Sequence, residues 1–166
     1  MAAYVEFFQG SGARVVPLIL GDDWSVNLDK VNKLDGVFFP GGEGGYMQLA
    51  RPIYEELKAI NDAGHFYPLW GTCAGFQTMA MLAADEGTNV ITYGLAAHNI
   101  NLPLDFIGDP TSSKMFGDLG FKAEGFHDYS VALNSHSYGI SPDKFETDAG
   151  LAAIYYPTSV SYTPDA

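Results

Sequence analysis

The chain's single cysteine lies in the segment Gly71-Thr72-Cys73-Ala74-Gly75, between an apolar run over residues 66–70 and a helical pattern over residues 76–82. Glycines on both sides of a nucleophile let the backbone turn sharply from a strand into a helix, so that the central side chain projects from the sheet edge. A lone cysteine is most often a small buried apolar residue. The strand–glycine–glycine–helix setting instead favours a nucleophile for acyl-transfer chemistry.

Apolar strand-like runs alternate with helical patterns through the first half of the chain. We expect helices over 2–9, 27–34 and 46–63, and strands over 13–20, 36–39 and 66–70. Such alternation predicts an α/β three-layer sandwich with a mainly parallel central sheet covered on both faces. Beyond Ala84 the sequence becomes richer in Gly, Asn, Asp, Pro and Ser, which indicates shorter strands and longer connections within the same domain.

A second glycine-rich segment, Pro40-Gly41-Gly42, follows the strand expected over 36–39. The carboxyl ends of parallel strands meet at one edge of a sheet, so this loop and Cys73 are expected on the same rim. A thiolate attacking a carbonyl needs donors for the oxyanion. The backbone N–H of Ala74 is one candidate, and Gly41 or Gly42 could supply the second. The alternative for the loop is a flexible turn, and the Gly-Lys-Ser/Thr ending of a phosphate-binding loop is absent.

Four histidines could act as acid, base or substrate contact. His65 precedes a strand beside Gly64 and is expected in a turn, while His98 and His127 are expected in polar surface loops. His136, within residues 133–138, is the best candidate for a substrate-facing imidazole. The single cysteine and the scattered histidines show no zinc-ligand spacing.

Length and charge restrict the possible functions further. The 166 residues suit one domain, and the net charge of -12 argues against a nucleic-acid partner. No apolar run is long enough for a membrane span, and the first residues lack the basic and apolar regions of a signal peptide. One cysteine excludes an internal disulfide.

Several segments together resemble the gamma-glutamyl hydrolases, a branch of the class I glutamine amidotransferase-like fold. The resemblance rests on residues 4–8, 11–17, 36–42, 67–76, 102–106, 113–116 and 134–140, in that order along the chain. It implies a cysteine hydrolase of γ-glutamyl bonds, with folylpoly-γ-glutamates as substrates and no metal or organic cofactor. Cys73 matches the nucleophile that forms a thioester, Ala74 and the loop with Gly41 and Gly42 match the oxyanion-hole elements, and His136 matches a substrate-cleft histidine. We accordingly expect the backbone of Gly42 to complete the oxyanion hole and Gly41 to contact the substrate together with His136.

The resemblance also implies a homodimer that is lysosomal, vacuolar or secreted. Family members have an additional strand before the helix expected over 2–9, and a Trp-His-Pro-Glu-type segment with the catalytic histidine; neither occurs in these residues. We therefore interpret residues 1–166 as a single, incomplete gamma-glutamyl hydrolase-like domain, inactive or feeble as it stands. The alternatives are a truncated non-catalytic binding or assembly subunit of the same fold, and a different glutaminase-type amidotransferase.

Overall fold

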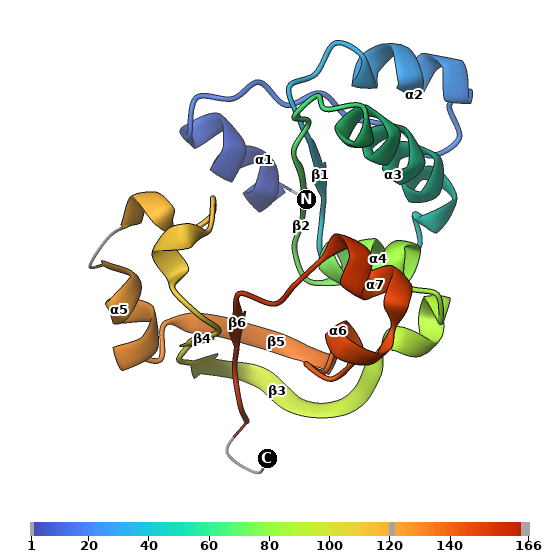
Figure 1. The fold of residues 1–166 in the computed structure, drawn as a ribbon. Coiled ribbons are helices and arrows are strands. Elements are labelled where there is room, and N and C mark those ends of the chain that lie inside the picture. Colours follow the sequence, from blue (N-terminus) through green and yellow to red (C-terminus); the bar gives the residue numbers. More distant parts are fainter. Residues whose placement is uncertain (1, 120–121, 164–166) are drawn as a thin grey trace. The chain divides into compact units, whose positions relative to one another are not determined.

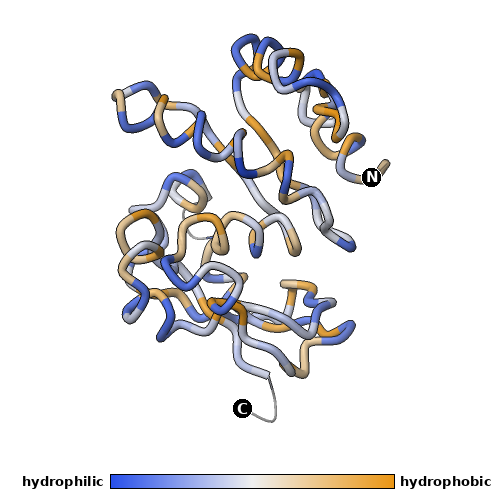
Figure 2. The backbone as a smooth tube through the Cα atoms, turned by 90° about the vertical axis from the view of Figure 1, so that its right-hand side faces the viewer, coloured by the Kyte–Doolittle hydropathy of each residue, from blue (hydrophilic) through white to orange (hydrophobic). Residues whose placement is uncertain are grey.

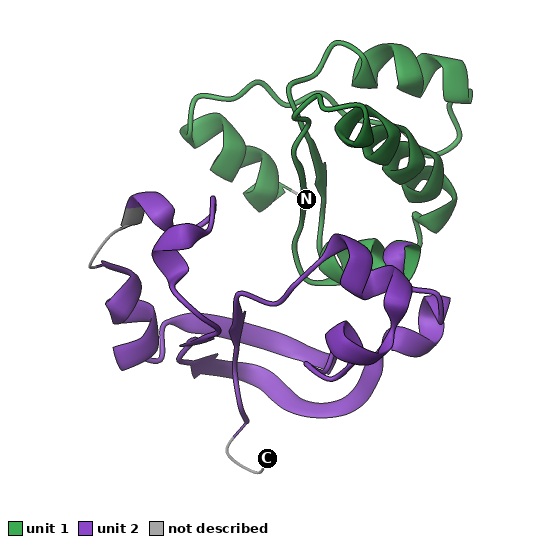
Figure 3. Ribbon diagram, in the orientation of Figure 1, with its two compact units in different colours: residues 1–82 green, residues 83–166 purple. Residues whose placement is uncertain are grey.

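The computed structural model describes residues 2–119 and 122–163, and the chain divides into two compact units. Unit 1 spans residues 1–82 and unit 2 spans residues 83–166 (Figure 3). The division falls close to Ala84, where the composition of the sequence changes. The single domain over 1–166 stays a prediction. No helix within the described ranges is both long enough and apolar enough to cross a membrane.

In unit 1, helices surround a short pair of parallel strands (Figure 1). Its elements are α1 (Ala2–Gly10), α2 (Trp24–Val31), β1 (Val37–Phe39), α3 (Met47–Asp62), β2 (Leu69–Gly71) and α4 (Ala74–Ala83). The register pairs Val37 with Leu69 and Phe39 with Gly71. This pairing brings the ends of β1 and β2 side by side, as expected for the rim that carries the glycine loop and the cysteine.

The core of unit 1 is built on one face of α3. The buried residues of this helix are Ala50, Ile53, Tyr54 and Leu57. They recur at spacings of three and four residues, which places them on one face of the helix. Figure 2 shows hydrophobic and hydrophilic residues alternating along the helical parts of the chain. Ile53 and Leu57 belong to the same buried cluster as Val37 and Phe39 of β1. The core therefore anchors β1 and with it the loop that follows.

The prediction of a strand over 13–20 is wrong: these residues form no strand, and Leu20 makes only an isolated bridge to Asp22. The Asn27 amide of α2 accepts from the Ile19 N–H at 3.1 Å and donates to the Ile19 carbonyl at 3.0 Å, and Lys30 Nζ donates to the Pro17 carbonyl at 3.2 Å. Side chains of α2 thus take backbone groups that a neighbouring strand would otherwise pair. The same helix begins at Trp24 rather than at the expected Asn27.

Unit 2 contains two antiparallel strand pairs among short helices (Figure 1). Its strands are β3 (Thr92–Leu102), β4 (Asp105–Phe106), β5 (Ala132–Gly139) and β6 (Ser159–Val160), with β3 paired to β5 and β4 to β6. Its α-helices are α5 (Lys122–Asp128), α6 (Lys144–Thr147) and α7 (Ala149–Ile154), and its 3-10 helices are η1 (Gly87–Val90), η2 (Pro110–Ser112) and η3 (Gly117–Leu119). The described residues therefore form a mixed α/β protein, in which β1 and β2 are the parallel pair among the named strands.

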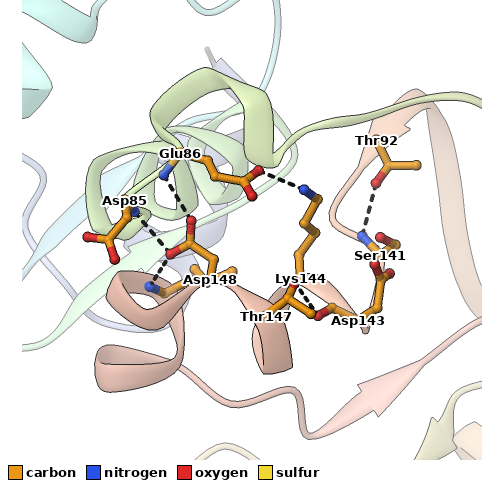
Figure 4. Close-up of polar contacts among 9 residues, drawn as sticks. Asp85, Glu86, Thr92, Ser141, Asp143, Lys144, Thr147 and Asp148 are labelled. Atoms are coloured by element: carbon orange, nitrogen blue, oxygen red, sulfur yellow. Dashed lines mark hydrogen bonds and ion pairs between the residues drawn. The ribbon is translucent and has the colours of Figure 1, made fainter.

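A buried carboxylate ties the helical part of unit 2 together (Figure 4). Asp148, 3% exposed, accepts from the backbone N–H groups of Asp85 at 3.0 Å, Glu86 at 2.9 Å and Leu151 at 2.8 Å. Lys144 Nζ adds an ion pair to the Glu86 carboxylate at 2.7 Å. The donors at Glu86 and Leu151 hold the pKa of Asp148 below its ordinary value of 3.8, because they favour the charged form.

Acid is expected to weaken unit 2 through Asp148. Because the folded-state pKa lies below the unfolded-state value, the carboxylate stabilises the fold fully above the unfolded-state pKa, and this contribution is lost as the pH falls through the folded-state pKa. In urea unfolding, the midpoint of Asp148→Asn should therefore fall less than that of the wild type between about pH 6 and about pH 2.

The matched control is Asp143→Asn, since Asp143 precedes α6 without a side-chain capping bond. That variant should keep the pH dependence of the wild type. Equal pH dependence in the wild type and in Asp148→Asn would show that protonation of Asp148 does not cause the loss of stability in acid.

Candidate active site

Cys73 lies between the last residue of β2 and the first residue of α4, with its side chain exposed. Its φ is 54°, in the left-handed region that non-glycine residues rarely adopt. Hydrogen bonds fix this turn: the Thr72 N–H donates to the Phe39 carbonyl at 3.1 Å, and the Gly75 N–H donates to the Thr72 carbonyl at 2.9 Å. The cysteine therefore sits at a strained strand-to-helix turn, the arrangement that presents a nucleophile to substrate.

Both glycines of the turn are required by close packing rather than by positive φ. A Cβ on Gly71 would lie 2.6 Å from the Met79 sulfur and from the Gly75 carbonyl carbon. A Cβ on Gly75 would overlap the Phe39 carbonyl oxygen and lie 2.6 Å from its carbon. The start of α4 therefore lies directly against the ends of β1 and β2, with no room for a side chain at either glycine.

The loop after β1 lies against the cysteine. A Cβ on Gly41 would lie 2.8 Å from Cys73 Cβ and 3.2 Å from the Thr72 carbonyl oxygen. Gly42 has a φ of 117°, and its environment is open. The expectation that this loop and Cys73 share one rim is confirmed for Gly41, because only a residue without a side chain can approach the cysteine so closely.

Ala74 is the first residue of α4, so its N–H belongs to the first turn, where backbone donors have no acceptor within the helix. Its own carbonyl accepts from Thr78 Oγ1 at 2.8 Å, which ties the first turn of the helix to a buried residue. The oxyanion roles of Ala74 and Gly42 and the substrate role of Gly41 stay predictions.

Two tyrosines at this site were not expected from the sequence. Tyr4 of α1 packs against Phe38, with 5.0 Å between the ring centroids. The Tyr4 hydroxyl oxygen would lie 2.5 Å from a Cβ on Gly41. Tyr46 precedes α3, and its hydroxyl donates to the Pro40 carbonyl at 2.7 Å. The only sequence signals for these tyrosines are that Tyr46 ends the glycine-rich loop and that Tyr4 lies on the apolar first helix.

The histidines lie on regular elements of unit 2, apart from His65, which directly follows the turn formed by Ala63 and Gly64 rather than lying in it. His98 and His127 are exposed, as predicted, but the predicted loops are wrong. His98 belongs to β3, with Nε2 2.7 Å from Ser137 Oγ, and His127 belongs to α5, with Nδ1 3.2 Å from Asp105 Oδ1. The β3 strand is broken by register shifts, which hid it in the sequence.

His136 lies on β5, with Nε2 3.1 Å from Asn134 Oδ1. Within the described part of the chain, its Nδ1 is buried and has no hydrogen-bond partner. Its substrate role stays a prediction. No group of His, Cys, Asp and Glu side chains suited to holding a metal ion occurs among the described residues.

No family model matches the chain, but its sequence is similar to those of several known proteins. Over 162 residues it is 30% identical to gamma-glutamyl hydrolase B of Dictyostelium discoideum, covering 93% of this chain and 46% of that protein. It is 32% identical to the gamma-glutamyl hydrolase of Bos taurus over 164 residues, and 28% identical to that of Homo sapiens over 165; each match covers 93% of this chain and 49% of the relative.

The matched region spans nearly all of the chain, including both the glycine loop and the cysteine turn. The chain spans about half the length of the curated relatives it matches. The sequence matches carry the identification, and the mixed α/β architecture with Cys73 at a strand-to-helix turn is compatible with it. This chain is a homologue of the gamma-glutamyl hydrolases over 93% of its length.

Proposed function

We propose that this chain carries the nucleophile and oxyanion hole of a cysteine-dependent hydrolase that cleaves γ-glutamyl bonds. The observation that carries the proposal is Cys73 at a φ of 54° with Gly41 packed against it. This geometry supports acyl-transfer chemistry in general, and the homology to gamma-glutamyl hydrolases supports the γ-glutamyl group as the acyl donor. The homology likewise supports a class I glutamine amidotransferase-like three-layer fold for the complete protein.

In the first step, the Cys73 thiolate bonds to the γ-carbonyl carbon, and the carbonyl electron pair moves onto oxygen. The N–H groups of Ala74 and of Gly42 or Gly41 would stabilise this oxyanion. Collapse of the tetrahedral species breaks the C–N bond, and the proton lost by the thiol ends on the leaving amine. Water then attacks the thioester, which releases the γ-carboxyl product and restores the thiol.

We propose pteroylpoly-γ-glutamates as the substrate class, with His136 as a contact in the substrate cleft. The test uses the complete natural protein and two isomeric substrates, pteroyl-diglutamate with a γ-linkage and the same compound with an α-linkage. We expect glutamate to be released from the γ-linked compound alone. A folded protein whose Cys73 reacts with iodoacetamide but which releases no glutamate would overturn the proposed function.

A further inference from the structure

The loop between β1 and α3 should be adaptable, yet it lies in close contact with the nucleophile. Its glycines at 42, 44 and 45 all have positive φ, with values of 117°, 72° and 82°. Glycine adopts many backbone conformations at little cost, so such a loop needs an external contact to hold one orientation. The Tyr46 hydroxyl provides one, because it donates to the Pro40 carbonyl at 2.7 Å.

Tyr46 is itself firmly held. It is the N-terminal cap residue directly before α3, and its carbonyl accepts from the Leu49 and Ala50 N–H groups, both at 2.9 Å. Its ring packs edge-on against Phe39, 5.9 Å between centroids, and against the buried cluster of unit 1. The anchor of the loop is therefore part of the rigid core.

Fixing one carbonyl also fixes the next amide. The Pro40–Gly41 peptide is planar and trans, so its C=O and N–H groups point in opposite directions. With the Pro40 carbonyl directed at the Tyr46 hydroxyl, the Gly41 N–H points away from Tyr46. A rotation of this peptide would break the 2.7 Å hydrogen bond and reorient the N–H of Gly41, the residue that packs against Cys73.

We propose that Tyr46 is a positioning residue, whose hydroxyl holds the Pro40–Gly41 peptide in the one orientation that presents the loop amides to the oxyanion formed on Cys73. The inference rests on the proposed function. Tyr46 acts through the loop and need not touch the substrate. An oxyanion hole requires donors that are oriented before charge develops, and the Tyr46 hydrogen bond would provide that orientation already in the free protein.

The protonation of Tyr46 agrees with a donor role. Burial raises the pKa of the Tyr46 phenol above its ordinary value of 10.0. A hydrogen bond with the Thr78 hydroxyl lowers this pKa, and the charges of Cys73 and Tyr4 raise it. The hydroxyl therefore keeps its proton near neutral pH, including when the neighbouring cysteine is ionised.

The test compares Tyr46→Phe with Tyr67→Phe in the complete natural protein. Tyr67 is a matched control in unit 1, because its half-buried hydroxyl also donates to a backbone carbonyl, that of Val31, at 2.8 Å, and burial also raises its pKa. Removing an oxyanion donor costs about 100- to 1,000-fold in kcat, so loss of a group that only orients the donors should cost about 10- to 100-fold. We expect that loss in kcat for Tyr46→Phe with KM little changed, and wild-type kcat for Tyr67→Phe.

Two probes of Cys73 separate this role from a general loss of structure. N-acetylglutamate γ-semialdehyde forms a tetrahedral adduct with the thiol and needs the oxyanion hole, whereas alkylation by iodoacetamide does not. Tyr46→Phe should bind the aldehyde about 10- to 100-fold more weakly and be alkylated at the wild-type rate.

Unchanged kcat and aldehyde binding in Tyr46→Phe would overturn the proposal, as would equal losses in Tyr46→Phe and Tyr67→Phe. A slower alkylation equal to the loss in kcat would also overturn it, because the cysteine itself would then be displaced. If instead the wild-type protein released no glutamate and bound no aldehyde, the proposed function would fail before Tyr46 came into question.

Discussion

Replacing Cys73 by alanine is expected to lower kcat for γ-glutamyl hydrolysis by at least about 10,000-fold, because the proposed acyl intermediate forms on the Cys73 sulfur. Cys73→Ser should be nearly as inactive, since a serine hydroxyl stays largely protonated where a thiol ionises readily. The measurement is the initial rate of glutamate release by the complete natural protein. Quenched intact mass analysis should show an acyl adduct in the wild type and none in Cys73→Ala.

The matched control lies in unit 2, where Ser137 Oγ is 2.7 Å from His98 Nε2. In this pair a hydroxyl is hydrogen-bonded to an imidazole, so it is the competing candidate for a nucleophile with its base. Ser137→Ala should keep wild-type turnover. Loss of activity in Ser137→Ala with activity retained in Cys73→Ala would move the nucleophile to unit 2 and refute the proposed mechanism.

The local features of the cysteine turn could be predicted from sequence because they depend on residue types within a few positions. Gly71, Cys73 and Gly75 carry the turn, and the apolar run over 66–70 predicts a strand before it. The structure confirms that strand as β2 but starts it later, at Leu69. The same holds for β1 and for α3, whose buried face follows helical spacing. These elements are specified by short-range pattern and by the core that the pattern creates.

The errors arise where a side chain from elsewhere competes with the local pattern. Residues 13–20 are apolar and β-branched, yet Asn27 takes the backbone groups of Ile19. In β3, an Asn99 φ of 47° and two register shifts interrupt the alternation that would have revealed a strand. Tyr4 and Tyr46 were missed at the site because their hydroxyls reach it through the fold, not through a motif.

Gly75→Ala is expected to change the stability of the protein strongly, and helix propensity and packing predict opposite signs for that change. Gly75 lies in α4, where helix propensity alone would make alanine about 1 kcal/mol more favourable. The added methyl group, however, would overlap the Phe39 carbonyl oxygen and lie 2.6 Å from the Phe39 carbonyl carbon. Both atoms belong to the backbone at the end of β1, so neither can move aside as a flexible side chain would.

We therefore expect Gly75→Ala to lower the free energy of unfolding by more than about 3 kcal/mol, because overpacking against backbone exceeds the gain in helix propensity. Gly10→Ala is the matched control: Gly10 ends α1, and a Cβ there would have no neighbour within 4 Å. Its unfolding free energy should change by less than about 1 kcal/mol in urea denaturation. A Gly75→Ala protein as stable as the wild type would mean that α4 does not start against β1. The same packing supports the Thr72–Phe39 hydrogen bond that holds Cys73 at the turn, so that result would remove the physical basis for placing the nucleophile there.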